Sequence, residues 1–286
     1  MSCRSLQVKC SPTQSLISCL ISEPWITTNG HKTPGPDWLP ENTSVLPSIQ
    51  ISSSARLRAV VFDMDGVIVD SHPAHRAAWT EFLHATGKNV SESELDFVMD
   101  GRRREDILAH FLGPLTQTQM VEYGRLKDEL FWRATSDVVP IPGVLEFIES
   151  LNASGITMAV ATSASASRTQ SILSRLGLMA RFDAVVTGDE VCKGKPDPYI
   201  YELACQRINC PPNFAVAVED AASGIRAAKG AGLRCVGIAG DKFRDRLAAA
   251  GADCVVQDFA DMTLAKFHCL LGIPPAQRPI SECESQ

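Results

Sequence analysis

Two aspartates stand at the end of an apolar stretch near residue 60 of this 286-residue chain. In AVVFDMDGVIVDS, which spans 59–71, Asp63 and Asp65 are separated by one residue and followed by Gly66. Side chains two residues apart in an extended segment point to the same side. Two carboxylates about 4 Å apart repel by roughly 4 kcal/mol at an effective dielectric constant near 20. The pairing therefore predicts a site in which a cation or a proton offsets this charge.

Polar side chains also follow other short apolar runs. Thr162 and Ser163 come at the end of ITMAVAT, Lys195 comes after DAVVT, and Glu219 and Asp220 come after FAVAV. If these runs are parallel strands, their carboxyl ends meet at one edge of the sheet, which is where open α/β sheets bind ligands. We therefore expect these residues to lie close to the aspartate pair.

This set of groups favours phosphate chemistry. Four carboxylates around one lysine repel one another, so either some of them are protonated or a divalent cation binds. If a cation binds, a partial shell of hard oxygen ligands favours Mg²⁺. Lys195 and a hydroxyl then remain to bind an anionic group such as phosphate. One carboxylate can attack phosphorus while the other handles the proton of the leaving group.

Each residue also has a simpler interpretation. Thr162 or Ser163 could cap the helix predicted to begin near 165, and Asp220 could cap the helix that follows it. Lys195 precedes a proline, where an exposed turn residue is common. The order of the whole set, with each member at a strand end, favours the functional interpretation.

The elements that position these residues follow from the hydrophobic pattern after residue 57. The predicted strands are 58–62, 156–162, 183–187, 214–218, 234–239 and 253–256. The predicted helices between and after them are 142–153, 165–176, 197–208, 221–231, 242–250 and 261–270. Strands that are apolar on both faces and joined by helices indicate an α/β fold with a parallel sheet covered on both sides.

A long stretch after the first strand contains no strand pattern. It has helical periodicity over about 73–86, 92–99, 103–112 and 117–135. A helical insertion of this size predicts a second domain or lid over the sheet. The expected organisation is a helical cap at 73–139, a core formed by 57–72 and 140–272, and a tail at 273–286.

Residues 1–56 differ from the rest because they are rich in Ser and Pro and lack sustained periodicity. This composition is typical of a disordered extension. Its few acidic residues leave a transit peptide as an alternative, which would place the protein in an organelle rather than in the cytoplasm.

Composition excludes several classes of function. The net charge of −6 argues against nucleic-acid binding, which needs a basic face. No apolar run reaches the roughly 18 residues that span a bilayer, so a membrane protein is not expected. The ten cysteines include no C-x-x-C pair, which favours buried thiols in a reducing compartment.

The chain resembles the haloacid dehalogenase-like superfamily over about residues 57–270. That family carries D-x-D, then Thr or Ser, then Lys, then an acidic pair. Here the matching residues are Asp63, Asp65, Thr162, Lys195, Glu219 and Asp220. The resemblance implies a Rossmann-like core with an inserted helical cap, a phospho-aspartate intermediate and Mg²⁺.

The resemblance also implies roles for these residues. Asp63 would be the nucleophile, and Asp65 the general acid/base that also binds Mg²⁺ through its backbone carbonyl. Asp220, with Glu219, would complete the metal site, which therefore comprises Asp63, Asp65, Glu219 and Asp220. Thr162 or Ser163 would bind the phosphoryl group together with Lys195. The loop after Thr162 departs from the mutase pattern, so the hydroxyl that contacts phosphate stays open.

The inserted segment is similar to the cap of β-phosphoglucomutase and related sugar-phosphate phosphatases. That similarity makes four residues candidates for substrate binding: His75, Trp79, Arg104 and Lys127. Two of them have simpler interpretations, because Arg104 could belong to a solvated basic face and His75 to a helix surface.

Three functions follow as hypotheses. The first is a Mg²⁺-dependent phosphatase that acts on a small sugar phosphate. The alternative is a β-phosphoglucomutase that interconverts β-glucose 1-phosphate and glucose 6-phosphate. The third is a non-catalytic binding protein on the same fold. The expected partner is a small phosphorylated metabolite, and the oligomeric state is left open, with a monomer compatible.

Overall fold

The computed structural model describes residues 57–135 and 137–273. The predictions for residues 1–56 and for the tail beyond residue 273 fall outside these ranges. Among the helices of the described residues, none combines the length and the apolar character needed to cross a membrane.

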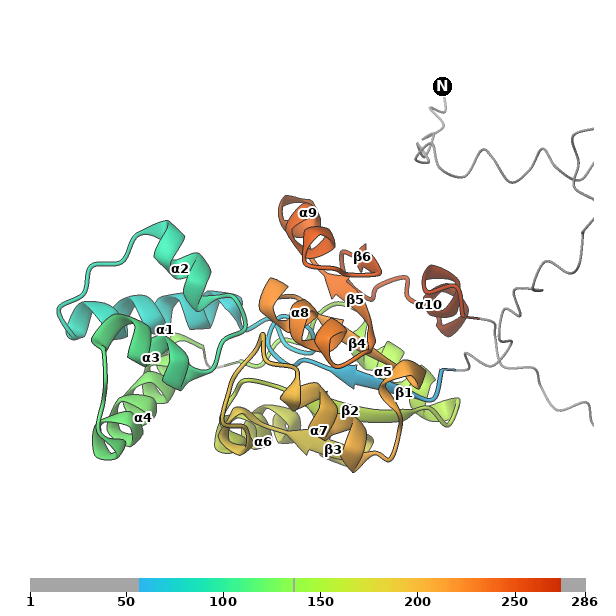
Figure 1. The fold of residues 1–286 in the computed structure, drawn as a ribbon, viewed down its shortest axis with the longest axis horizontal. Helices are drawn as coiled ribbons and strands as arrows, with labels where there is room; N and C mark the ends of the chain where they lie inside the picture. The colour runs from blue at the N-terminus through green and yellow to red at the C-terminus, as the bar shows by residue number, and fades with distance from the viewer. Residues whose placement is uncertain (1–56, 136, 274–286) are drawn as a thin grey trace, which may run out of the picture. The chain divides into compact units, whose positions relative to one another are not determined.

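The core is a six-stranded parallel sheet with the strand order β3-β2-β1-β4-β5-β6 (Figure 1). The strands are β1 (Ala59–Phe62), β2 (Thr157–Ala161), β3 (Ala184–Val186), β4 (Ala215–Glu219), β5 (Arg234–Ile238) and β6 (Cys254–Val256). The D-x-D motif of Asp63 and Asp65 follows β1, which lies at the centre of the sheet between β2 and β4. The α/β fold class is confirmed, and each predicted strand agrees with the structure to within one residue at either end.

Helices cover both faces of the sheet. They are α5 (Val144–Ala153), α6 (Ala166–Arg175), α7 (Tyr199–Arg207), α8 (Ala222–Gly230), α9 (Asp241–Ala249) and α10 (Leu264–Leu270). Val60 and Phe62 of β1 belong to a hydrophobic cluster that includes residues of α5, α6 and α10, whereas Ala59 and Val61 belong to a second cluster that includes residues of α7, α8 and α9. This alternation follows from the two-residue period of a strand, and it buries both faces.

Three short 3₁₀ turns complete the core. They are η2 (Met179–Arg181), η3 (Gly188–Glu190) and η4 (Pro212–Phe214). Each precedes or follows a strand, and they were not among the predicted elements because a single turn leaves no periodic signal.

Four helices form the insertion between β1 and α5, drawn in blue-green to green in Figure 1. They are α1 (His72–Ala85), α2 (Glu92–Val98), α3 (Arg104–Leu112) and α4 (Gln117–Ala134). Capping boxes begin two of them: Ser91 with Glu94 at α2, and Thr116 with Gln119 at α4. The inserted helical cap is confirmed, while its limits at 73 and 139 stay a prediction.

The cap is joined to the core by two adjacent connections. Val69 pairs in antiparallel fashion with Pro140. The amide of Asp70 donates to the carbonyl of Val139 at 2.8 Å, and the amide of Ile141 donates to that of Ile68 at 3.0 Å. The outgoing and returning chains therefore form a short two-stranded connection.

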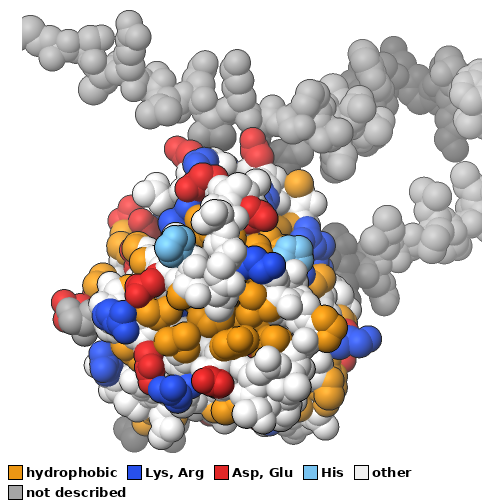
Figure 2. Space-filling model, turned by 90° about the vertical axis from the view of Figure 1, so that its left-hand side faces the viewer, with side chains coloured by type: hydrophobic (Ala, Val, Ile, Leu, Met, Phe, Trp, Pro, Cys, Tyr) orange, Lys and Arg blue, Asp and Glu red, His pale blue; other side chains and the backbone are white. Residues whose placement is uncertain are grey.

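The face on the cap side carries charges of both signs. Lys, Arg, Asp and Glu side chains surround a strip of hydrophobic side chains in Figure 2. On the described part of this face, the mixture gives no continuous basic surface of the kind that a nucleic acid needs.

Candidate active site

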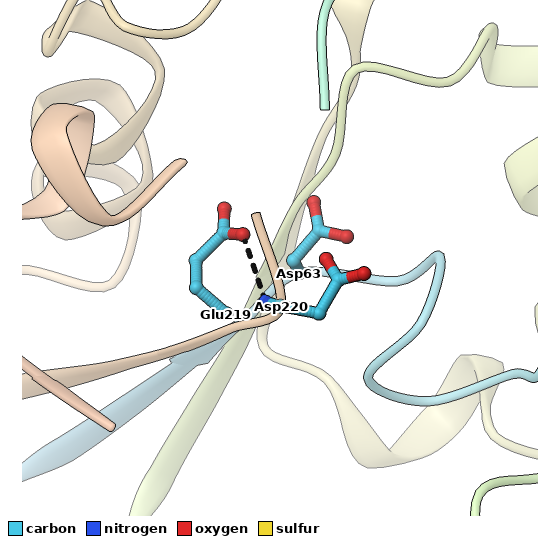
Figure 3. Close-up of side chains that lie close together, drawn as sticks. All are labelled: Asp63, Glu219 and Asp220. Carbon is cyan, nitrogen blue, oxygen red and sulfur yellow. Dashed lines mark hydrogen bonds between the residues drawn. The ribbon is translucent and has the colours of Figure 1, made fainter. Parts of the chain in front are cut away.

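Three carboxylates meet at the carboxyl end of the sheet. Asp63 follows β1, while Glu219 and Asp220 come at and after the end of β4, the neighbouring strand. One oxygen of each lies within 4.8 Å of the others. Figure 3 shows the carboxylates of Asp63 and Asp220 directed to the same side, whereas Glu219 turns back toward the backbone of Asp220. The predicted convergence of these strand ends is present in the structure.

Lys195 supplies the positive charge in this cluster. Its Nζ donates to Asp63 Oδ1 at 2.5 Å, to Glu219 Oε1 at 2.6 Å and to the carbonyl oxygen of Ala161 at 3.0 Å. Its side chain is 1% exposed, so the exposed-turn interpretation is wrong. Burial opposes the charged form, but Asp63 and Glu219 raise the pKa of Lys195 above its usual range.

The surroundings of Asp63 disfavour the ionised form of its carboxyl group. Burial raises its pKa well above the usual value, and the charges of Glu219, Asp220 and Asp65 raise it further, against the opposing effect of Lys195. An added cation would relieve this repulsion, because it would favour the ionised form of each carboxylate.

Glu219 has both oxygens occupied by the protein. Oε1 accepts hydrogen bonds from Lys195 and, at 2.6 Å, from the hydroxyl of Tyr201. Oε2 accepts from the backbone amides of Asp220 and Ala221. Glu219 therefore lies beside the candidate metal site. In this arrangement its oxygens hold Lys195 and the backbone at the end of β4 in place.

The carboxylate of Asp65 turns toward the cap rather than toward this cluster. Its Oδ1 accepts a hydrogen bond of 2.6 Å from Ser71 and lies 3.3 Å from His75 Nε2. Arg168 donates to both oxygens at 2.8 Å. Burial alone would raise the pKa of Asp65, but Arg168 and His75 lower it well below its usual value.

His75 and Lys127 form a buried pair on the cap side of Asp65. Lys127 Nζ lies 2.9 Å from His75 Nδ1. Burial, reinforced by the charge of Lys127, lowers the pKa of His75 to about 3. Burial also lowers the pKa of Lys127 from 10.5 to about 7. The helix-surface interpretation of His75 is therefore wrong, because its neutral ring is packed between Asp65 and Lys127.

Trp79 and Arg104 line the same cavity from the cap. Trp79 is buried, and its ring lies 5.5 Å from Lys127 Nζ. Arg104 donates to Asp128 at 3.0 Å and lies 3.1 Å from Glu105, so two carboxylates already neutralise it. Arg104 is partly buried and faces the cavity, unlike a residue of a fully solvated basic surface.

The hydroxyls after β2 have different partners. Thr162 is buried, and its Oγ1 accepts a hydrogen bond of 3.1 Å from the amide of Ala164. Ser163 Oγ donates to the carbonyl oxygen of Gly101 in the cap at 2.7 Å. The residue that caps α6 is Ser165, not either of these two. Likewise, Asp220 makes no side-chain cap at α8, where Ala221 holds the N-cap position.

The cavity between cap and core has a volume of about 80 Å³. Nine predicted site residues line it: Asp63, Asp65, His75, Trp79, Arg104, Lys127, Thr162, Ser163 and Asp220. The other two, Lys195 and Glu219, do not line it, and Lys195 contacts the carboxylates of both Asp63 and Glu219. Ordinary ligand sites measure about 300–1,000 Å³, so the cavity in this arrangement is small.

Several residues of the site were not identified from the sequence. Arg168, in the first turn of α6, and Ser71, just before α1, hold Asp65. His72 Nε2 lies 2.7 Å from Asp220 Oδ2. Burial alone would lower the pKa of His72, but the hydrogen bond and charge of Asp220 raise it to about 9. The only signal for Arg168 was its position shortly after a strand end.

The donor chemistry of the carboxylate cluster fits a hard divalent cation. Asp63 and Asp220 supply carboxylate oxygens on the same side, and Mg²⁺ prefers oxygen ligands in partial protein shells. Burial and, after it, the neighbouring carboxylates raise the pKa of Asp63, and a cation bound here would favour its ionised form.

Comparison with known proteins identifies the family. The family model described as haloacid dehalogenase-like hydrolase matches residues 60–238. This range covers more than half of the chain and includes every strand-end residue of the site. The chain therefore belongs to the haloacid dehalogenase-like hydrolases and is an enzyme of the phosphatase and phosphotransferase type.

Individual relatives are similar over most of the chain. A phosphorylated carbohydrates phosphatase from Thermotoga maritima is 35% identical over 189 residues, covering 62% of this chain and 82% of its own length. A β-phosphoglucomutase from Bacillus subtilis is 30% identical over 229 residues, covering 74% and 94%. A crystal structure of a CbbY mutant from Rhodobacter sphaeroides in complex with xylulose-(1,5)bisphosphate matches with a TM-score of 0.64 and 31% identity, covering 73% and 98%.

Proposed function

We propose that this protein is a Mg²⁺-dependent phosphatase that acts on a small phosphorylated sugar. The observation that carries the proposal is the buried Asp63, which shares Lys195 with Glu219 and lies at one end of a cavity also lined by Asp65. A carboxylate in this position is a nucleophile with a positively charged neighbour that can hold the oxygens of a phosphoryl group.

The reaction proceeds in two displacements. An oxygen of Asp63 attacks phosphorus, and the bond from phosphorus to the sugar oxygen breaks while that oxygen takes a proton from Asp65. Water then attacks the phospho-aspartate, the bond from phosphorus to Asp63 breaks, and Asp65 accepts the proton of the water. The products are the free sugar and inorganic phosphate, and both aspartates return to their starting states.

The protein's own groups organise these steps. Asp63 and Asp220 would hold Mg²⁺ together with the backbone carbonyl of Asp65, and Glu219 would support the site from behind. The bound cation supplies charge stabilisation for the phosphoryl oxygens. Lys195 and the hydroxyl of Thr162 would bind the same oxygens. Arg168 and His75 hold Asp65 ionised in this arrangement, so Asp65 has to turn away from Arg168 and take up a proton from solvent or from the substrate phosphate before the first displacement.

The choice of a sugar phosphate is supported by the cap and by the relatives. The cavity holds buried polar groups of His75 and Lys127 beside the ring of Trp79, a combination suited to hydroxyl groups on an apolar ring. The relatives named above are described as a carbohydrate phosphatase, a sugar-phosphate mutase and a protein crystallised with a sugar bisphosphate.

A phosphate-release screen of the full chain over phosphorylated sugars, with Mg²⁺, tests the proposal. We expect turnover of at least one sugar phosphate that EDTA abolishes and Mg²⁺ restores. Asp63→Asn should reduce kcat by roughly 10⁴-fold or more, because it removes the attacking group. Turnover that survives in this variant would contradict the assignment of Asp63.

A β-phosphoglucomutase is the second candidate, because cap cations face the cavity. Arg104 and Lys127 both line it and could hold the second phosphate of a bisphosphate intermediate. β-Glucose 1-phosphate supplied with a trace of the bisphosphate separates the two functions. Glucose 6-phosphate as the product identifies a mutase, and free phosphate identifies a phosphatase.

A further inference from the structure

Asp100 is a cap residue buried against the core. It lies between α2 and α3, and its side chain is 7% exposed. Its Oδ1 accepts a hydrogen bond of 3.0 Å from Arg246 on α9 and one of 3.3 Å from the amide of Ser223 on α8. The hydroxyl of Ser223 also donates to the backbone carbonyl of Asp100. Asp100 therefore joins the cap to two helices of the core through its side chain and its backbone.

Further arginines concentrate positive charge around this carboxylate. Arg102 and Arg226 approach Asp100 Oδ2 at 3.7 and 3.8 Å. Arg226 and Arg246 both belong to the core, so the cap finds these partners only when it is docked. A buried carboxylate that lost them would have to be rehydrated.

The core surface under this loop is shaped for close contact. Ala221, Ala222, Ser223 and Gly224 begin α8 with small side chains only. Gly101 has a φ of +68°, and a Cβ on it would lie 3.0 Å from the Cβ of Ala221. The loop therefore rests on the core at a distance that only glycine allows without adjustment.

A second contact of the same loop lies next to the phosphate-binding end of β2. Gly101 accepts the hydrogen bond from Ser163, and Gly101, Arg102 and Arg104 line the cavity. The cavity of about 80 Å³ is too small for a sugar phosphate, whose binding sites measure several hundred Å³. Lifting this loop from the core would enlarge the room for a substrate, and its return would enclose the substrate.

We propose that Asp100 is a latch that holds the cap closed through its hydrogen bonds with Arg246 and Ser223 on the core. Asp100 is a positioning residue in this arrangement, because it fixes the loop that carries Arg102 and Arg104 over the site. The effect on turnover rests on the proposed function, whereas the docking itself does not depend on it.

Hydrogen exchange of the full chain tests the docking directly. Arg246→Ala removes the one arginine that hydrogen-bonds to the Asp100 carboxylate among the described residues, and because Arg246 is 43% exposed the core should fold normally. We expect faster amide exchange in peptides that cover residues 97–104. The matched control is Arg244→Ala on the same helix, whose guanidinium donates to the carbonyl of Val255 within the core. Exchange in Arg246→Ala that equals that of Arg244→Ala would overturn the proposal.

Steady-state kinetics test what the latch does. With a sugar phosphate that the wild type hydrolyses, Arg246→Ala and Asp100→Asn should each raise KM by roughly tenfold and change kcat less, as for loss of one charge-assisted hydrogen bond. The double variant should be no worse than the stronger single variant, because the two residues act through each other. Fully additive effects would overturn the proposal. A wild type without turnover would refute the proposed function, and the exchange comparison would still decide the latch.

Discussion

Arg168 and Asp65 form a two-pronged ion pair between α6 and the end of β1. Two nitrogens of the guanidinium donate to the two carboxylate oxygens of Asp65, each at 2.8 Å. The guanidinium also lies 5.1 Å from the ring centre of Phe131 in the cap. The orientation of Asp65 is thus set by a residue of the core that also contacts the cap.

Substitution of Arg168 should therefore impair catalysis. We expect Arg168→Ala to lower kcat/KM by roughly 10²-fold, because a misplaced acid/base group costs about that much. The kcat/KM of Arg168→Lys should lie between those of Arg168→Ala and the wild type, since lysine keeps the charge but cannot make the paired contact. Steady-state kinetics with a sugar phosphate measure both. An Arg168→Ala enzyme within twofold of the wild type would contradict this role.

Removal of Lys195 should destabilise the fold and increase the benefit of Mg²⁺. Lys195→Met leaves Asp63 and Glu219 buried without their counter-charge, which should cost roughly 3–5 kcal/mol. A divalent cation would replace part of that charge, so Mg²⁺ should raise the stability of the variant more than that of the wild type. Chemical unfolding with and without Mg²⁺ measures both effects. Lys193→Met, at an exposed neighbouring position, is the control, and equal stability of the two variants would refute the prediction.

The stability contribution of Lys127 should depend on pH. Burial lowers the pKa of Lys127 from 10.5 to about 7, so between these values the unfolded chain binds a proton that the folded chain does not. The folded state should therefore lose stability as the pH falls from about 10.5 to about 7, and this contribution should stay constant below pH 7.

Lys127→Met removes this titration. The free energy of unfolding of Lys127→Met minus that of the wild type should be most positive near pH 7 and should become smaller toward pH 9.5. Urea unfolding of both proteins at several pH values measures the difference. A difference that does not vary with pH would show that Lys127 titrates normally in the folded protein.

Gly66 is the glycine on which the geometry of the D-x-D motif depends most. It has a φ of +75°, and a Cβ on it would lie 2.1 Å from Asp220 Oδ2. Gly66→Ala should therefore lose stability and also weaken Mg²⁺ binding, because Asp220 has to move. Gly87→Ala is a matched control, since its φ is +78° and no atom lies within 4 Å of the added Cβ.

The free energy of unfolding of Gly87→Ala should fall by only roughly 1–2 kcal/mol, which is the cost of a left-handed backbone conformation for a non-glycine residue. Chemical unfolding and calorimetric titration with Mg²⁺ distinguish the two effects. Equal losses of stability and equal Mg²⁺ affinity in the two variants would show that Asp220 adjusts without cost.

The convergence of the site could be predicted because topology alone dictates it. Once the runs around Phe62, Ala161 and Val218 are assigned to parallel strands, the residues that follow them must meet at one edge. Lys195 is predictable for the same reason, although its depth of burial is not. The long helices of the cap were predictable from periodicity, since each carries a repeated apolar face.

The remaining contacts depend on distances that one sequence does not contain. Arg168 and Tyr201 lie on helix surfaces whose orientation is fixed only by packing, so nothing in their local sequence links them to Asp65 or Glu219. Asp100 has an ordinary sequence context, and its importance arises from Arg246, which is 146 residues away in the chain. Such pairings follow from how the cap docks rather than from any local pattern.

The paired connections at Val69 and Pro140 have a consequence for the history of this architecture. Because the chain leaves and re-enters the core at neighbouring points, the whole insertion could be shortened, enlarged or exchanged without disturbing the order of the strands. Recombination at this point would give a new specificity to an unchanged chemical centre. The same junction is the natural place to graft the cap of another protein onto this scaffold.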